Sequence, residues 1–268
     1  MLRAKLSCVP AWMLFSLAAF LQGCSTTTPD NTAGWSPNKI YAEAKDEIDS
    51  GSYSKAIPLL EKLEGRAAGT LLAQQAQLDK AYAYYKNNEK AQAITTLERF
   101  IKLHPASPAL DYALYLKGIV NFNENLGFLS SITQQDLSER DQKAAKESFE
   151  AFNDLVNRFP DSKYTPDARQ RMTYILNALA EYEVHVARYY YSRGAYVAAI
   201  NRAQLALSEY RNVPAAEDAL GILLNAYNAL GMDQLRDDTR RVLEKNYPQS
   251  TYLTQGMKAR AQPWWKLW

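Results

Sequence analysis

Hydrophobic residues recur at helical spacing along almost the whole chain between Pro37 and Pro248. Two stretches show the pattern most clearly: Ile175, Leu179, Tyr182, Val186, Tyr189, and Ala219, Leu220, Leu223, Leu224, Tyr227, Leu230. Residues spaced in this way lie on one face of a helix, so each stretch presents an apolar stripe. The alternation typical of strands never extends beyond a few residues. The pattern predicts an all-α fold.

A motif typical of a helix–turn–helix repeat occurs twice. Gly51–Ala56 reads GSYSKA and Gly194–Ala199 reads GAYVAA, so both follow the pattern G-x-Y-x-x-A. In tetratricopeptide repeats this is the turn and the start of the second helix, where glycine permits a tight turn and alanine allows close packing. Asn88–Ala93 fits the same frame, and Gly231–Arg236 fits it more loosely. In the remaining frame the turn position falls at Lys143.

Small residues recur in register with this motif. The position twelve residues before the motif alanine is occupied by Ala44, Ala81 and Ala187, and Ser148 takes the alanine position in the third frame. Each such position lets two helices approach closely, as the repeat requires. A helical bundle without repeats is the alternative, but it would not need matched positions in several frames.

Three proline turns complete the repeat pattern. They read His104-Pro105-Ala106-Ser107, Phe159-Pro160-Asp161-Ser162 and Tyr247-Pro248-Gln249-Ser250. We expect the proline to stop each second helix and the serine to cap the next one. Residues 37–248 are therefore predicted to form an all-α, tetratricopeptide-like α-solenoid of about five helix pairs, at 37–64, 70–104, 108–159, 165–210 and 215–247.

The segment before the repeats has the features of a bacterial lipoprotein signal. The basic residues Arg3 and Lys5 precede a short apolar run, which ends at Leu21-Gln22-Gly23-Cys24, a lipobox. We expect 1–23 to be a signal peptide, Cys24 to be lipidated, and 24–36 to be a flexible tether. The alternative is an ordinary signal peptide with a structural cysteine. By resemblance to sorted lipoproteins, the serine after Cys24 implies the outer membrane.

Charge and composition exclude several function classes. Removing Arg3 and Lys5 from the 31 basic residues leaves 29, against 29 acidic residues, so the sequence gives no electrostatic sign of nucleic-acid binding. The two histidines, His104 and His185, match no metal motif, and no nucleophile or phosphate-loop motif occurs. We therefore expect no metal, no cofactor and no catalytic site, and structural roles for both histidines.

Three segments carry a resemblance to a known family: Phe159–Ala168 (FPDSKYTPDA), Tyr182–Tyr190 (YEVHVARYY) and Arg193–Ala198 (RGAYVA). With the lipobox, they resemble the lipoprotein subunit of the outer-membrane β-barrel assembly machinery, the BamD or ComL family. The resemblance implies an adaptor, lipid-anchored on the periplasmic side of the outer membrane. It would dock on the periplasmic domains of the barrel-forming assembly protein, work beside other assembly lipoproteins, and help receive unfolded outer-membrane barrel proteins.

The resemblance assigns the first repeats to the client and the last repeats to the assembly protein. The candidates for client binding, which we expect to be exposed, are Tyr41, Lys45, Tyr85, Tyr115 and Asn121. The alternative for the tyrosines is a role as core spacers between helices. The candidates for docking are Arg188, Arg193 and Tyr196, because arginine and aromatic residues are enriched at interface hot spots. The alternative for Arg193 is a helix C-cap cation beside Gly194.

The sequence alone does not decide the roles of two further segments, and it leaves two competing functions. The insertion at 121–142 is a packed flap or a partner-binding tip. The tail at 249–268 holds three tryptophans in Pro263–Trp268, and it could lie on the bilayer, dock on a partner or imitate the client signal. The competing functions are another tetratricopeptide lipoprotein of the outer membrane, such as a secretin pilotin or a scaffold for murein enzymes, and a murein-acting enzyme.

Overall fold

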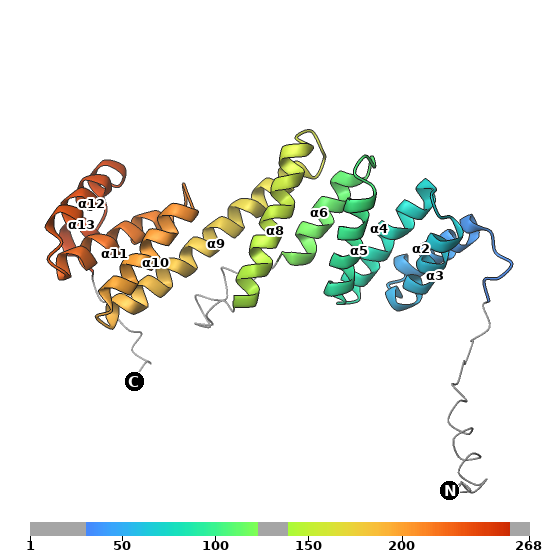
Figure 1. Ribbon diagram of the computed structural model, residues 1–268, viewed down its shortest axis with the longest axis horizontal. Coiled ribbons are helices and arrows are strands. Elements are labelled where there is room, and N and C mark those ends of the chain that lie inside the picture. The colour runs from blue at the N-terminus through green and yellow to red at the C-terminus, as the bar shows by residue number, and fades with distance from the viewer. Residues whose placement is uncertain (1–30, 123–138, 258–268) are drawn as a thin grey trace, which may run out of the picture.

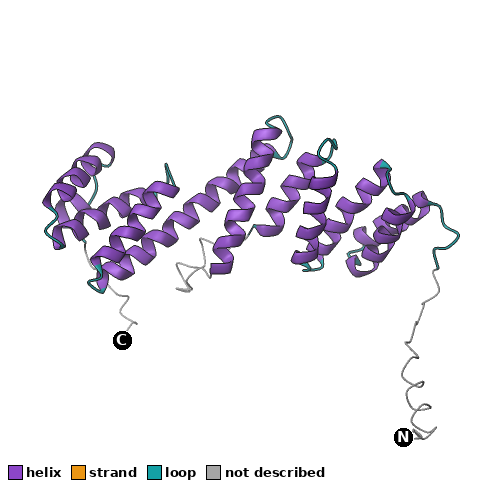
Figure 2. Cartoon of the chain, viewed as in Figure 1, coloured by secondary structure: helices purple, strands orange, loops and turns teal. Residues whose placement is uncertain are grey.

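The computed structural model describes residues 31–122 and 139–257, and this part of the chain is built of α-helices without strands (Figures 1 and 2). The helices are α2 (Pro37–Asp49), α3 (Tyr53–Arg66), α4 (Leu71–Lys86), α5 (Lys90–Leu103), α6 (Leu110–Asn121), α8 (Glu139–Arg158), α9 (Thr165–Ser192), α10 (Tyr196–Glu209), α11 (Ala215–Ala229), α12 (Asp233–Asn246) and α13 (Tyr252–Gln255). Successive helices pack pairwise, each pair stacks on the next, and the result is the elongated array of Figure 1. The predicted all-α, tetratricopeptide-like solenoid is confirmed.

The turns between paired helices share one backbone conformation. Gly51, Gly194 and Gly231 have φ of 78°, 75° and 69°, and Asn88 takes the same left-handed conformation with φ of 63°. In all four the second helix begins two residues later, as the aligned frames require. The third pair departs from the frame, because α8 begins at Glu139 and the predicted turn position, Lys143, lies inside this helix.

Small side chains make close helix packing possible. The matched positions Ala44, Ala56, Ala81, Ala93, Ser148, Ala187 and Ala199 are all fully buried. In the third pair the Ser148 hydroxyl donates a hydrogen bond to the carbonyl of Gly118 on α6, over 2.8 Å. A Cβ atom at Gly118 would overlap the ring of Phe152. The ring of Phe152 on α8 therefore packs directly against the backbone of α6 at Gly118. The Arg236 position of the last frame is half-buried, because only the short α13 follows it.

The serines of the three proline turns do not cap the next helix, so this prediction is wrong. Ser107, Ser162 and Ser250 each precede the capping residue and accept a hydrogen bond from the backbone N–H two residues later. The hydroxyls of Ser107 and Ser162 donate instead to Gln74 (2.9 Å) and Asp111 (2.7 Å). These two acceptors lie on the first helix of the preceding pair, so the serines tie neighbouring pairs together.

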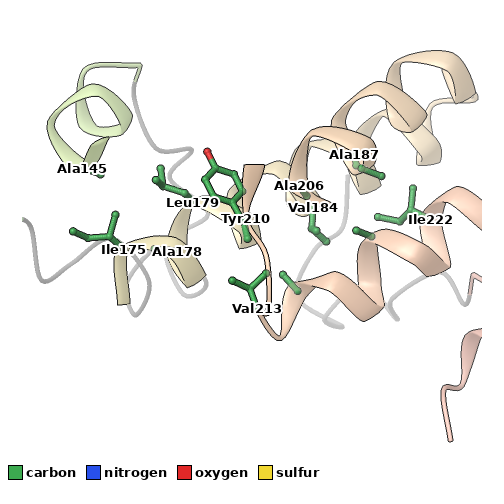
Figure 3. Packing of buried hydrophobic residues seen from close by; sticks show 14 of the residues in the cluster. Ala145, Ile175, Ala178, Leu179, Val184, Ala187, Ala206, Tyr210, Val213 and Ile222 are labelled. Carbon is green, nitrogen blue, oxygen red and sulfur yellow. The ribbon is translucent and has the colours of Figure 1, made fainter. Parts of the chain in front are cut away.

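The largest hydrophobic core runs continuously through the last three pairs. Figure 3 shows part of it, a row of buried side chains that includes Ile175, Leu179 and Val184 of α9, Tyr210 and Val213, which follow α10, and Ile222 of α11. The long helix α9 packs against α8, α10 and α11, so it joins the third, fourth and fifth pairs. The surfaces that this half of the molecule presents are therefore held on a common core.

Candidate protein-interaction site

An exposed group of side chains surrounds the turn between α9 and α10. Arg193 is the C-cap residue of α9, and its guanidinium lies 5.2 Å from the ring centroid of Tyr189, which is 53% exposed. Val197, in the first turn of α10, is 61% exposed. Tyr196, at the start of α10, completes this group of four, which we call the docking edge.

The charge of Arg193 has no counter-ion inside the described part of the chain. No carboxylate there lies within ion-pair distance of the guanidinium, and its contact is with the face of the Tyr189 ring. Its place after the last turn of α9 is also the C-cap position that the alternative interpretation expected, where a cation complements the helix dipole. The two interpretations are compatible, since capping leaves the guanidinium exposed.

Tyr196 supports the docking edge from inside. Its ring meets that of Tyr191 edge to face, with centroids 5.3 Å apart and an angle of 60° between the planes. Burial first, and the neighbouring Tyr196 second, raise the pKa of Tyr191 above its ordinary value. The half-buried Tyr196 therefore fixes the start of α10 more than it offers a free surface.

Arg188, the third docking candidate, is engaged within the chain. Its guanidinium is 3.0 Å from the carboxylate of Asp218 on α11 and donates a hydrogen bond to the Tyr252 hydroxyl over 3.3 Å. Burial alone would lower the pKa of Arg188, but the charge of Asp218, the nearby Tyr252 and the hydrogen bonds to both together outweigh it, and the pKa is raised. This arginine ties α9, α11 and α13 together, and it does not belong to the docking edge.

The client candidates are less exposed than expected. Asn121 is only 7% exposed, and its Nδ2 has no hydrogen-bond partner in the described part of the chain. The expectation of exposure fails because α6 packs against α4, α5 and α8, which buries residues on several of its faces, Asn121 in its last turn among them. Lys45 and Tyr85 are half-buried.

Two of the candidate tyrosines act as spacers between neighbouring pairs. The Tyr41 hydroxyl of α2 donates to Asp79 of α4 over 3.0 Å, and burial together with this carboxylate raises the pKa of Tyr41 to about 12. The Tyr115 hydroxyl of α6 donates to Asp167 of α9 over 2.8 Å, while its ring stacks on Tyr164 at 4.7 Å. For these two the spacer interpretation holds.

Sequence reasoning missed the exposed apolar residues of the docking edge. The apolar spacing predicts Tyr189 on the buried stripe of α9, but the buried positions at this end of the helix are Glu183, Val184 and Ala187. Val197 lies inside the repeat motif, at a position that the motif leaves variable. A helical projection that starts from the motif alanines would have placed it away from the core.

Membrane and metal chemistry can be judged only for residues 31–122 and 139–257. No helix there is both long enough and apolar enough to cross a bilayer, and no group of acidic, histidine or cysteine side chains there is placed to hold a metal ion. Cys24, most of the insertion and the Trp-rich end of the tail lie outside the described residues.

Comparison with known proteins identifies the family. A family model described as an outer membrane lipoprotein matches residues 34–243. The outer membrane protein assembly factor BamD of Neisseria meningitidis is 49% identical over 258 residues, which cover 94% of this chain and 97% of the relative. BamD of Vibrio cholerae is 36% identical, covering 85% of this chain and 94% of the relative. BamD of Haemophilus influenzae is 33% identical, covering 87% and 88%. The chain therefore belongs to the BamD family and has a role in outer-membrane protein assembly.

Proposed function

We propose that this protein is a lipid-anchored adaptor that docks on the periplasmic domains of the barrel-forming assembly protein through its docking edge. The acyl chains on Cys24 would hold it at the periplasmic side of the outer membrane. Several acyl chains together bury enough methylene groups for a stable anchor, at about 0.8 kcal/mol each. Other assembly lipoproteins would share the complex. The repeats serve as a scaffold and carry out no catalysis.

The observation that supports docking at this edge is the free charge of Arg193. A guanidinium can pair with a carboxylate through two parallel hydrogen bonds, and such a pair is directional as well as strong. The ring of Tyr189 beneath the guanidinium stabilises its position, so less conformational freedom is lost on binding. Val197 adds exposed apolar area beside the charge. A partner that fits this edge presents an acidic residue flanked by apolar side chains.

Affinity purification tests the docking proposal. A tagged chain is purified from detergent-solubilised envelopes, and the co-purifying proteins are identified and quantified. We expect the barrel-forming assembly protein at near-equal amount, and its loss with Arg193→Glu. Arg211→Glu is the matched control, because Arg211 is also exposed but lies after the opposite end of α10. Recovery of a secretin or a murein enzyme without the assembly protein would contradict the proposed function, and equal losses in both variants would contradict the docking edge.

For client binding, the proposal is confined to the first two pairs. Lys45 and Tyr85 keep partly accessible side chains there, whereas Tyr41 and Tyr115 are spacers and Asn121 is buried. Crosslinking through a photoreactive residue at Lys45 or Tyr85 should capture unfolded barrel proteins. The same residue placed at Lys102, an exposed position on α5, should capture much less.

A further inference from the structure

The last helix pair contains a slot that is shaped for one aromatic ring. Gly221 lies in the middle of α11, and the ring of Tyr252 rests so closely on it that a Cβ atom there would overlap the ring. The Tyr252 hydroxyl is hydrogen-bonded to Asp218 and accepts a hydrogen bond from Arg188. We call this site, made of Arg188, Asp218, Gly221 and Asn225, the tyrosine slot.

The slot also recognises the backbone of the segment that fills it. The side-chain oxygen of Asn225 accepts a hydrogen bond from the backbone N–H of Met257 over 3.3 Å, while its nitrogen donates to the Gly221 carbonyl over 2.8 Å. The asparagine is thereby held in the orientation that presents an acceptor. A site that combines a ring slot, two partners for a phenol and a backbone contact has the features of peptide recognition.

The segment that occupies the slot is short, and within α13 it packs on the core through Tyr252 and Leu253. It enters through the proline turn at Pro248 like the first helix of another repeat, but α13 has only four residues and Gly256 ends it with φ of 62°. None of the α13 residues is fully buried. So short a helix has little stability of its own, since the cost of nucleation is not recovered. Local opening of such a terminal segment requires far less free energy than global unfolding.

We propose that the tyrosine slot is a peptide-binding site, filled in the resting chain by its own Tyr252, which accepts a tyrosine-bearing segment of an unfolded barrel protein when α13 leaves. The ligand class follows from the chemistry. Asp218 and Arg188 form an ion pair, and a phenol hydroxyl adds a donor to Asp218 and an acceptor to Arg188, whereas phenylalanine supplies neither. Barrel strands carry aromatic residues at both ends of their membrane-facing surface, so an unfolded client offers such segments. This inference rests on the proposed function for the identity of the ligand.

The test measures binding of a labelled peptide with the sequence of residues 249–257 (QSTYLTQGM) to the purified full-length chain by fluorescence anisotropy. Tyr252→Ala should bind the peptide about tenfold or more tightly than the unaltered chain, because a tethered tyrosine competes at about millimolar effective concentration. Tyr182→Ala is the matched control, because it removes a half-buried tyrosine from α9 that belongs neither to the slot nor to the docking edge, and it leaves the slot filled. A peptide with phenylalanine in place of the tyrosine should bind Tyr252→Ala about tenfold more weakly, since it loses the bonds to two charged groups.

Two results would overturn the proposal. One is a Tyr252→Ala chain with a native circular dichroism spectrum and no gain in peptide affinity over the unaltered chain. The other is a double variant, Tyr252→Ala with Gly221→Ala, that binds the tyrosine peptide as tightly as Tyr252→Ala alone, although the added methyl group fills the slot. Because Gly221→Ala could disturb α11, Asp218→Asn in the same background is measured beside it, and it should weaken the tyrosine peptide but not the phenylalanine peptide. These measurements use the isolated chain, so their failure is distinct from a failed capture of the assembly protein.

Discussion

Replacement of Gly118 by alanine tests how tightly the third helix pair is built. Gly118 is buried in α6, and a Cβ atom there would overlap the ring of Phe152, which is fully buried in α8. The ring has little room to retreat, because Tyr115 and Phe122 lie against it with centroids 6.0 and 6.4 Å away. The hydrogen bond from Ser148 to the Gly118 carbonyl would shift with any displacement of α6.

Two opposing effects set the magnitude. Alanine is a better helix former than glycine by about 1 kcal/mol in a helix interior. Inserting an extra methyl group into a closely packed core is unfavourable by about 1–3 kcal/mol. At Gly118 the second effect should dominate, because the neighbouring ring cannot move into solvent. We expect Gly118→Ala to lower the free energy of unfolding by about 1–2 kcal/mol.

Urea unfolding followed by circular dichroism measures this change, and Gly65→Ala provides the control. Gly65 is an exposed glycine near the end of α3, and a Cβ atom there would meet nothing within 4 Å. The same substitution should therefore stabilise the protein at Gly65, by about 0.5 kcal/mol, through helix propensity alone. A decrease in the free energy of unfolding for Gly118→Ala and an increase for Gly65→Ala would support the packing argument. A Gly118→Ala chain that is as stable as the unaltered protein would refute it, since the ring of Phe152 would then have relaxed freely.

Three further outcomes are expected. Burial alone would raise the pKa of Glu64, but the hydrogen bonds from Lys80 and Gln77 and the charges of Lys80 and Arg99 together outweigh it and hold the pKa below its ordinary 4.5. The stability from this group is complete above that value and is lost as the pH falls, so Glu64→Gln should lose less stability than the unaltered chain between about pH 7 and about pH 3 in thermal melts. Arg66→Ala removes the hydrogen bonds to Thr32 (2.6 and 3.1 Å), and hydrogen exchange of the turn that follows Thr32 should accelerate. Ser162→Ala should lower the urea midpoint by an amount equivalent to about 1 kcal/mol, because it breaks a bond between neighbouring pairs.

The fold could be predicted from the sequence because the repeat fixes several positions at once. The repeat places a left-handed turn residue, a small residue and a helix-ending proline at fixed positions, each for a local physical reason. Together these positions predict where most helices begin. The exception is α8, where the frame was counted across the insertion and Lys143 was placed at a turn. The repeat spacing cannot predict where a helix begins after an insertion, because the length of the insertion is not set by the repeat.

Exposure was harder to predict than helix position. A helix of a solenoid contacts its own pair and both neighbouring pairs, so its apolar stripe is wider than that of a surface helix, and polar residues such as Asn121 become buried. Tyr189 shows the opposite error. It follows the apolar spacing of α9 and is predicted to be buried, but its side chain is exposed. Neither outcome follows from the spacing within one helix, because both depend on what the adjacent pairs cover.

Arg188, near the end of α9, and Arg193, its C-cap residue, show why a binding site is harder to predict from sequence than a fold. Arg188 and Arg193 lie five residues apart in two adjacent family-like segments, and by residue type they are equal candidates. They differ in their contacts because Asp218, on the next pair, forms an ion pair with Arg188 and does not reach Arg193. The ion pair holds Arg188 at the tyrosine slot, whereas no carboxylate of the described residues pairs with the exposed guanidinium of Arg193. If this distinction is correct, Arg188→Glu should first disturb α13 and the slot, and it should weaken docking less than Arg193→Glu does in the same affinity purification.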